Sequence, residues 1–129
     1  MKRAESLISQ ADHFEYLPGK HLNGHLEIGE IIGDLNGVNI ALSAYEKIIK
    51  EKGLDRKASL KEFFIQLAKV WRNKTEPHRQ EQIVNTDTHP VGEFRVNGVL
   101  KNVDTFHEIF ETKEGDNMYM APEDRVKLW

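Results

Sequence analysis

Two carboxylates that lie four residues apart are the first feature of this sequence that could do chemistry. Glu30 and Asp34 lie in a stretch whose apolar residues recur at intervals close to 3.6, which predicts a helix that begins near Gly29 and runs to about Lys52. Residues four apart share one face of a helix, so the two carboxylates would point the same way. Such a pair could bind a metal or move a proton, but acids near a helix N-terminus are also favoured by the helix dipole alone.

A stripe of glycines runs along the same predicted helix. Gly29, Gly33 and Gly37 repeat at four-residue spacing. A glycine in a helix interior costs about 0.5–1 kcal/mol relative to alanine, so three of them need a reason. The usual reason is that another backbone or a bound group comes very close. We therefore expect a close neighbour along this stripe, beside the acidic pair.

A second group of polar residues lies further along the chain. Asp87, His89 and Arg95 add a carboxylate, an imidazole and a guanidinium to the acidic pair. Together these groups could hold a metal and stabilise an oxyanion. From residue type and spacing alone they could equally be surface charges, and a histidine in a loop is ordinarily exposed to solvent.

The only histidine pair with the spacing of a zinc-binding helix is His21 and His25. It lacks the glutamate after the first histidine that would activate water, and Gly24 makes the segment a poor helix. We interpret this spacing as a coincidence. The sequence also contains no phosphate-binding loop, no dinucleotide fingerprint and no nucleophile elbow.

Composition narrows the classes of protein. The 129 residues, taken as a single domain over 1–129, are enough for a hydrophobic core. The absence of cysteine excludes disulfides and thiolate metal sites, and it fits a reducing compartment. A net charge of −3 gives no basic footprint for nucleic acid. No apolar run resembles a membrane span or a signal peptide, so the sequence favours a cytoplasmic location.

Periodicity and breakers predict a mainly α chain of four to five helices with one long loop. The expected helices cover residues 2–14, about 29–52, 59–71, 75–83 and 103–110. Ser59, Thr75 and Asn102 are the expected N-terminal caps. The segment 85–98 is expected to be irregular because Pro90, Gly92 and Gly98 interrupt it, with a short extended piece at 94–96. A loop of that length in a small domain tends to be functional.

Three blocks in order resemble the C-terminal part of the neprilysin-like zinc metallopeptidases, which include bacterial endopeptidases of the oligopeptidase O type. Residues 22–24 and 29–37 are similar to the family pattern N-G…G-E-N-I-A-D-x-G-G. Residues 85–98 resemble T-D-x-H-x-x-G-x-F-R-x-x-G, and 118–129 resemble M-Y-x-x-P-E…W. The resemblance implies the helical C-terminal portion of a zincin-like catalytic domain.

The resemblance also implies a role for each candidate residue. Glu30 matches the glutamate that is the third ligand of the catalytic zinc. Asp34 matches the aspartate that orients a zinc-binding histidine. His89 matches the histidine that stabilises the oxyanion, with Asp87 holding its ring. Arg95 matches the arginine that grips substrate carbonyls.

The sequence also differs from the family pattern in several respects. The H-E-x-x-H helix, the catalytic glutamate and the edge strand that binds substrate are not among these residues. Ile31, Gly33 and Asn36 replace the asparagine, alanine and glycine of the first block. Val126 stands where animal members have a cysteine near the terminal tryptophan, which favours a bacterial member without disulfides.

The resemblance implies a fragment of a zinc-dependent metalloendopeptidase that hydrolyses peptide bonds in oligopeptides. Whether this chain is itself an enzyme is uncertain, and we expect it to be inactive alone because one carboxylate cannot hold a catalytic zinc and no general base is present. Zinc and the peptide substrate would belong to the full-length enzyme. Two alternatives stay open: an inactive remnant that forms a homo-oligomer, and a module that binds peptide without cleaving it.

Overall fold

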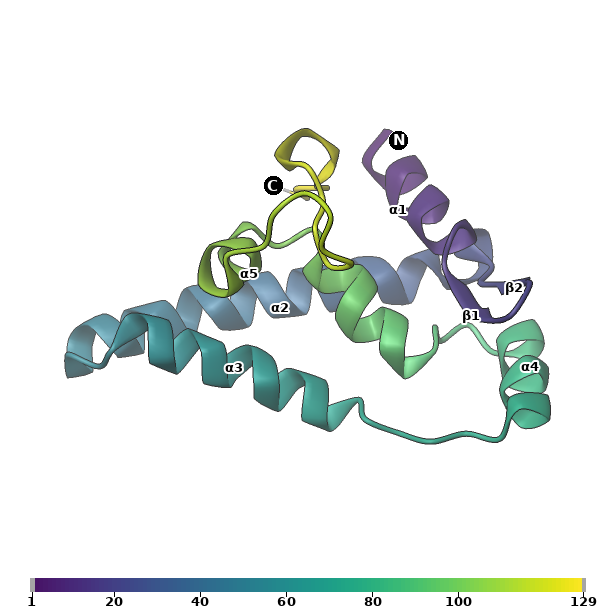
Figure 1. Cartoon of the computed structure of the whole chain (residues 1–129), viewed down its shortest axis with the longest axis horizontal. Helices are drawn as coiled ribbons and strands as arrows, with labels where there is room; N and C mark the ends of the chain where they lie inside the picture. Colours follow the sequence, from purple (N-terminus) through teal and green to yellow (C-terminus); the bar gives the residue numbers. More distant parts are fainter. Residues whose placement is uncertain (1, 129) are drawn as a thin grey trace.

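The computed structural model describes residues 2–128, and within them the chain is mainly helical, with a single small hairpin (Figure 1). None of the described helices is both long enough and apolar enough to cross a lipid bilayer. The elements are, in order, α1 (Lys2–Asp12), β1 (Glu15–Leu17), β2 (Lys20–His21), α2 (Gly24–Lys52), α3 (Arg56–Val70), α4 (Pro77–Thr86), the π-helix η1 (Phe94–Gly98), α5 (Asp104–Phe110) and the 3-10 helix η2 (Pro122–Asp124).

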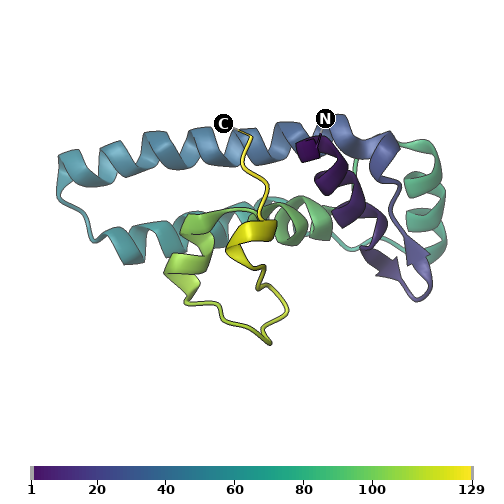
Figure 2. The same ribbon diagram turned by 90° about the horizontal axis from the view of Figure 1, so that it is seen from above.

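The scaffold of the molecule is a long antiparallel pair formed by α2 and α3 (Figures 1 and 2). Gly53 ends α2 in the left-handed conformation, with φ of +61°, and its N–H group donates to the carbonyls of Ile49 and Lys50. The predicted stop at this glycine is confirmed. The cap of α3 is Asp55, whose side chain accepts a hydrogen bond from the Ala58 N–H group. The predicted cap at Ser59 is wrong because Asp55 starts the helix one turn earlier.

The first turn of α2 lies directly against α1. A Cβ added to Gly24 would collide with the backbone of Ile8, so only glycine permits this crossing. The Gly24 N–H group donates to Asp12 Oδ1 at 2.8 Å, and Asn23 caps the helix by accepting from the Leu26 N–H group at 3.1 Å. These contacts begin α2 earlier than the apolar spacing indicates. The residues before it form a hairpin of β1 with β2.

The segment expected to be irregular is largely helical. Residues 92–100 form one helical segment with η1 at its centre, so the predicted extended piece at 94–96 is wrong. Its glycines serve close packing instead of breaking the helix. A Cβ on Gly92 would meet the Trp71 carbonyl oxygen at 2.6 Å, and one on Gly98 would meet the Phe94 ring at 2.5 Å. The buried side chains of this segment that join the core are Phe94, Val96, Val99 and Leu100.

Asn102 follows this segment and hydrogen-bonds to residues near both ends of the described chain. Its side chain is almost fully buried, and its Oδ1 accepts from Gln10 Nε2 at 3.1 Å and from the Val126 N–H group at 2.8 Å. Its Nδ2 donates to Gln10 Oε1 at 2.7 Å and to the Gly98 carbonyl at 3.1 Å. Asn102 therefore does not cap the next helix as predicted, and α5 begins at Asp104 without a side-chain cap.

The short helix α4 also starts without the predicted cap. It begins at Pro77, where proline is well tolerated because a first-turn N–H group needs no helical partner. Glu76 precedes it and makes no side-chain cap, so the expected cap at Thr75 is wrong.

Replacing Asn102 by alanine should destabilise the protein strongly. The change leaves the buried Val126 N–H group without its partner, and an orphaned buried polar group costs about 1–3 kcal/mol. We expect a total loss of roughly 2–4 kcal/mol for the several bonds removed, measured by urea unfolding. The matched control is Asn117→Ala in the exposed loop, which should change stability by less than about 0.5 kcal/mol. Equal effects of the two changes would contradict the role of Asn102.

Candidate functional site

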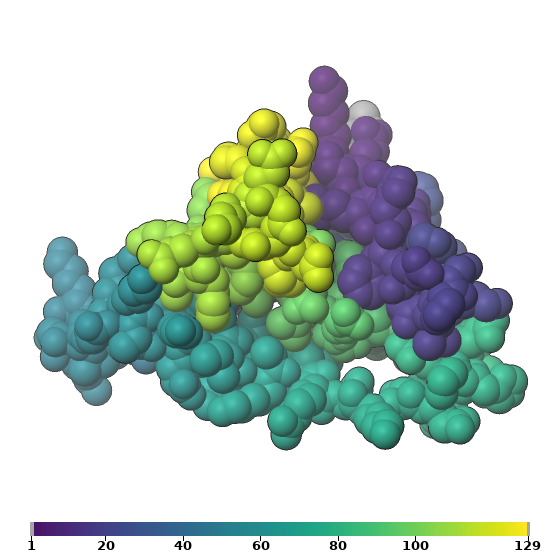
Figure 3. Space-filling model, viewed as in Figure 1, coloured from purple at the N-terminus to yellow at the C-terminus, as the bar shows by residue number. Residues whose placement is uncertain are grey.

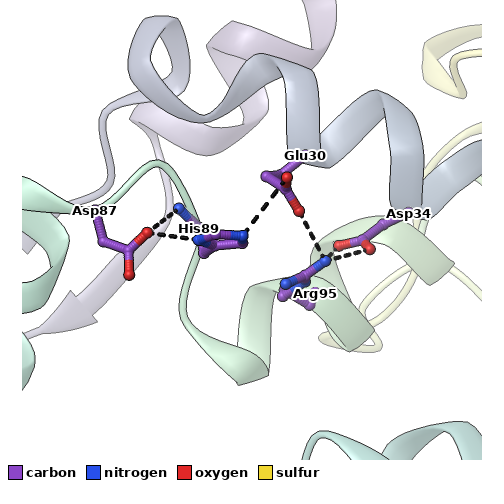
Figure 4. Close-up of polar contacts among 5 residues, drawn as sticks. All are labelled: Glu30, Asp34, Asp87, His89 and Arg95. Carbon is purple, nitrogen blue, oxygen red and sulfur yellow. Dashed lines mark hydrogen bonds and ion pairs between the residues drawn. The ribbon is translucent and has the colours of Figure 1, made fainter.

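An arginine clamped by two carboxylates lies at the centre of the candidate site (Figure 4). Arg95 Nε donates to Asp34 Oδ2 at 2.7 Å, and Arg95 Nη2 donates to Asp34 Oδ1 at 2.7 Å. The same Nη2 reaches Glu30 Oε2 at 3.1 Å. This fork fits the planar geometry of the guanidinium and fixes its orientation. Because Glu30 and Asp34 are one turn apart on α2, one arginine can contact both.

An aromatic ring also packs against the guanidinium of Arg95. Its carbon Cζ lies 4.0 Å from the centroid of the Trp71 ring, at the end of α3. The Arg95 side chain is only 12% exposed. The hydrogen bonds to Asp34, followed by the charges of Asp34 and Glu30, raise the pKa of Arg95 despite its burial. Arg95 thus stays charged and joins α2, α3 and η1 at one point.

His89 lies on the other side of Glu30 and is oriented by Asp87. The His89 Nδ1 atom lies 2.5 Å from Asp87 Oδ1, and the backbone N–H group of His89 donates to the same oxygen at 3.1 Å. The His89 Nε2 atom lies 3.6 Å from Glu30 Oε1. The hydrogen bond to Asp87 and then the charge of Glu30 raise the pKa of His89, and the bond to His89 lowers the pKa of Asp87.

The structure brings together all five residues that the sequence singles out. Their contacts run in one line from Asp87 through His89, Glu30 and Arg95 to Asp34 (Figure 4). Three of them come from the segment 87–95 and two from α2. The His89 side chain is half exposed, whereas Asp34 is mostly buried. The cluster is therefore open at its histidine end and closed at its arginine end.

The glycine stripe beside this cluster has no close neighbour. A Cβ added to Gly29, Gly33 or Gly37 would have no described atom outside its own helix within 4 Å. The expected close approach is therefore not made by any residue in the range 2–128. This face of α2 is open where it borders the acidic pair.

The described residues do not by themselves form a metal site. Within 2–128, no group of three or more His, Asp or Glu side chains is placed to hold a metal ion. Glu30 has the right donor chemistry for one zinc ligand, but residues 2–128 do not place two further ligands with it around a common point. His21 lies in β2 and His25 in α2, so they do not share a helix face. This arrangement agrees with the interpretation of their spacing as a coincidence.

Sequence reasoning missed two residues of this region. Periodicity predicts Trp71 as part of the apolar core, and its ring does pack against the core, but the same ring also lies against Arg95. No spacing signal relates these two residues, which lie on different elements. Glu27 is also fully buried at the start of α2. The sequence does contain one signal of this burial: Glu27 is a charged residue that interrupts an apolar run, between Leu26 and Ile28.

The sequence of the chain matches a known family over almost its whole length. The pattern of Peptidase family M13 matches residues 1–126. A neutral endopeptidase of Lactococcus lactis subsp. lactis (strain IL1403) is 40% identical over 128 residues, which cover 99% of this chain and 19% of that protein. Human neprilysin is 32% identical over 136 residues, covering 99% of this chain and 18% of the relative.

The fold agrees with that relationship. The crystal structure of the Mycobacterium tuberculosis zinc metalloprotease Zmp1 in complex with an inhibitor superposes with a TM-score of 0.89 at 32% identity. It covers 99% of this chain and 21% of the Zmp1 chain. The chain thus spans about a fifth of the length of the relatives it matches. The predicted neprilysin-like resemblance and mainly α fold are confirmed, and the chain belongs to peptidase family M13.

Proposed function

We propose that this chain is the part of a zinc-dependent metalloendopeptidase that supplies the third zinc ligand and the residues that stabilise the transition state. The peptidase would cleave peptide bonds in oligopeptides. The observation that carries the proposal is the convergence of Glu30, Asp34, His89 and Arg95 around one open carboxylate. These are the positions at which the sequence resembles the family's functional residues.

Glu30 is suited to bind zinc together with ligands from outside this chain. Its side chain is about one-third exposed (37%), and its contacts to Arg95 and His89 leave lone pairs of the carboxylate free. Zinc, when bound, acts as a Lewis acid and lowers the pKa of a water molecule. Asp34 is held on both oxygens by Arg95, and each oxygen can still accept a second hydrogen bond from an incoming imidazole.

His89 is suited to stabilise negative charge that develops on a substrate oxygen. Asp87 holds its Nδ1 atom, so the Nε2 atom faces the Glu30 side of the cluster. The raised pKa of His89 keeps more of the ring protonated near neutral pH, and the protonated ring donates from Nε2. A donor fixed in advance is the usual requirement for oxyanion stabilisation.

Arg95 is suited to hold a substrate carbonyl. Its Nε and Nη2 atoms serve the two carboxylates, and no hydrogen bond from Nη1 to another residue of 2–128 is present. The Trp71 ring and Asp34 fix the plane of the guanidinium before substrate binds. A preorganised donor loses less entropy on binding than a mobile one.

A chimera tests the role of Glu30 directly. This chain would replace the matching segment of the Lactococcus lactis neutral endopeptidase, to which it is 40% identical. We expect the chimera to bind zinc and cleave peptides, and Glu30→Gln to abolish both because one ligand is lost. Metal analysis and peptide cleavage are the measurements.

The control variant of the chimera is Glu51→Gln, an exposed acid on the same helix. It should leave zinc content and cleavage unchanged. Full zinc content and full cleavage in the Glu30→Gln chimera would refute the assignment of Glu30.

The purified chain alone should cleave no peptide, because its described residues offer one candidate metal ligand. The measurement is hydrolysis of a fluorogenic peptide library with zinc added. Steady zinc-dependent cleavage that Glu30→Ala abolishes would overturn this expectation.

A second candidate function, an inactive remnant that self-associates, is favoured by one observation. The glycine stripe of α2 continues in exposed apolar residues, Leu26 before it and Ile40 and Ile48 after it, at helical spacing. A second copy could cover this face. A mass in solution that rises with protein concentration, together with an inactive chimera, would favour the remnant over the peptidase fragment.

The Asp87–His89 pair predicts a pH effect. Because the folded-state pKa of His89 is raised, the pair stabilises the fold below the ordinary histidine pKa, and this contribution is lost as pH rises through the folded value. Asp87→Asn should lower the titration midpoint of His89 measured by NMR. Asp124→Asn, in the exposed helix η2, is the control and should leave the midpoint in place. An unchanged midpoint in Asp87→Asn would contradict the pairing.

A further inference from the structure

Glu27 is a buried acid that the proposed peptidase chemistry does not use. Its side chain is fully buried (0% exposed), and neither Oε1 nor Oε2 has a hydrogen-bond partner within residues 2–128. It lies in the first turn of α2, where Gly24 permits the close crossing of α1. Burying a carboxylate without a partner is costly, and burying it ionised costs far more than burying it neutral.

The groups around Glu27 give it no positive partner. Burial is the main cause that raises the pKa of Glu27 to about 7, and the charges of Asp12 and then Asp87 raise it further. The titratable groups that face it are Asp12 of α1, Tyr16 of β1 and Asp87 after α4, with the Lys20–Glu81 ion pair beside Tyr16.

Both carboxylates that face Glu27 already take part in hydrogen bonds elsewhere in the structure. Asp12 Oδ1 accepts the Gly24 N–H group and so ties the end of α1 to the start of α2. Asp87 holds the ring of His89. A negative charge on Glu27 would repel both carboxylates, and neither can turn away without giving up its contact.

We propose that Glu27 is a positioning residue whose proton holds the Asp12–Gly24 junction and the Asp87–His89 loop in place. When Glu27 loses this proton to solvent, three carboxylates of one junction carry charge together. The junction then loosens, and His89 loses its fixed place beside Glu30. The inference rests on the proposed function only for the role of His89, and its test needs no peptidase activity.

The direction of the pH dependence follows from proton binding. A carboxylic acid whose folded-state pKa lies above its unfolded value binds its proton more tightly in the folded state. The stability that Glu27 contributes is therefore complete below its ordinary pKa of 4.5 and is lost as pH rises towards about 7. The equilibrium constant for unfolding should rise on the order of a hundredfold over this window.

The test compares the whole chain with Glu27→Gln, which keeps the shape and removes the charge. Glu51→Gln, at an exposed position of the same helix, is the matched control. Urea unfolding from pH 5 to pH 8 gives the global effect, and hydrogen exchange of the Gly24 amide, corrected for its intrinsic pH dependence, gives the local one. NMR of the His89 ring reports its position.

We expect the unfolding constant of Glu27→Gln to depend far less on pH than those of the wild type and of Glu51→Gln. We also expect Gly24 protection to fall and a second step to appear in the His89 titration near pH 7 in the wild type, but not in Glu27→Gln. A purely structural acid would change the global stability without that second step.

Two results would overturn the proposal. One is a pH dependence of Glu27→Gln that runs parallel to the wild type, and the other is a His89 titration that is the same in both proteins. If Glu27→Gln does not fold, the carboxyl carbon of Glu27 is titrated by NMR in the wild type. A midpoint near 7 then supports the proposal, and one near 4.5 overturns it. An inactive chimera would refute the peptidase assignment and leave these readouts intact.

Discussion

One buried ionic contact joins α2 to the segment that carries Arg95 and to the end of α3. Arg95 lies between Asp34 and Glu30 on one side and the Trp71 ring on the other. The guanidinium is mostly buried, so its positive charge is tolerable only while the carboxylates remain opposite it. That requirement restricts how far α2 can turn relative to the segment that carries Arg95. The Asp87–His89 pair then lies where the histidine reaches Glu30.

The sequence identifies the polar residues that lie together better than it predicts the path of the backbone. The spacing of Glu30 and Asp34 places them on one face. Residue type and then the family resemblance add Asp87, His89 and Arg95, and the structure brings all five together. Motif residues are recognisable because the chemistry restricts their type. Their distances from one another depend on tertiary packing, which local spacing does not contain.

The predictions from the sequence are wrong where a residue serves tertiary packing instead of local backbone conformation. Gly92 and Gly98 look like helix breakers, yet both lie in a helical segment. Gly92 leaves room for a backbone carbonyl, and Gly98 leaves room for an aromatic ring. Asn102 looks like a helix cap, yet its amide binds groups more than twenty residues away in both directions. A single sequence cannot separate these uses, because a turn and a close contact select the same small or polar residues.

The contact of Asn102 with Gln10 and Val126 makes the two ends of the described chain mechanically dependent on each other. Arg3 strengthens this link, since its Nη1 atom donates to the Leu128 carbonyl at 2.6 Å. Figure 1 shows the two ends on the same side of α2. Fraying that starts at either end therefore removes the support of the other. A protease that removes the segment around Val126 would also take away contacts that hold α1, the helix against which α2 begins.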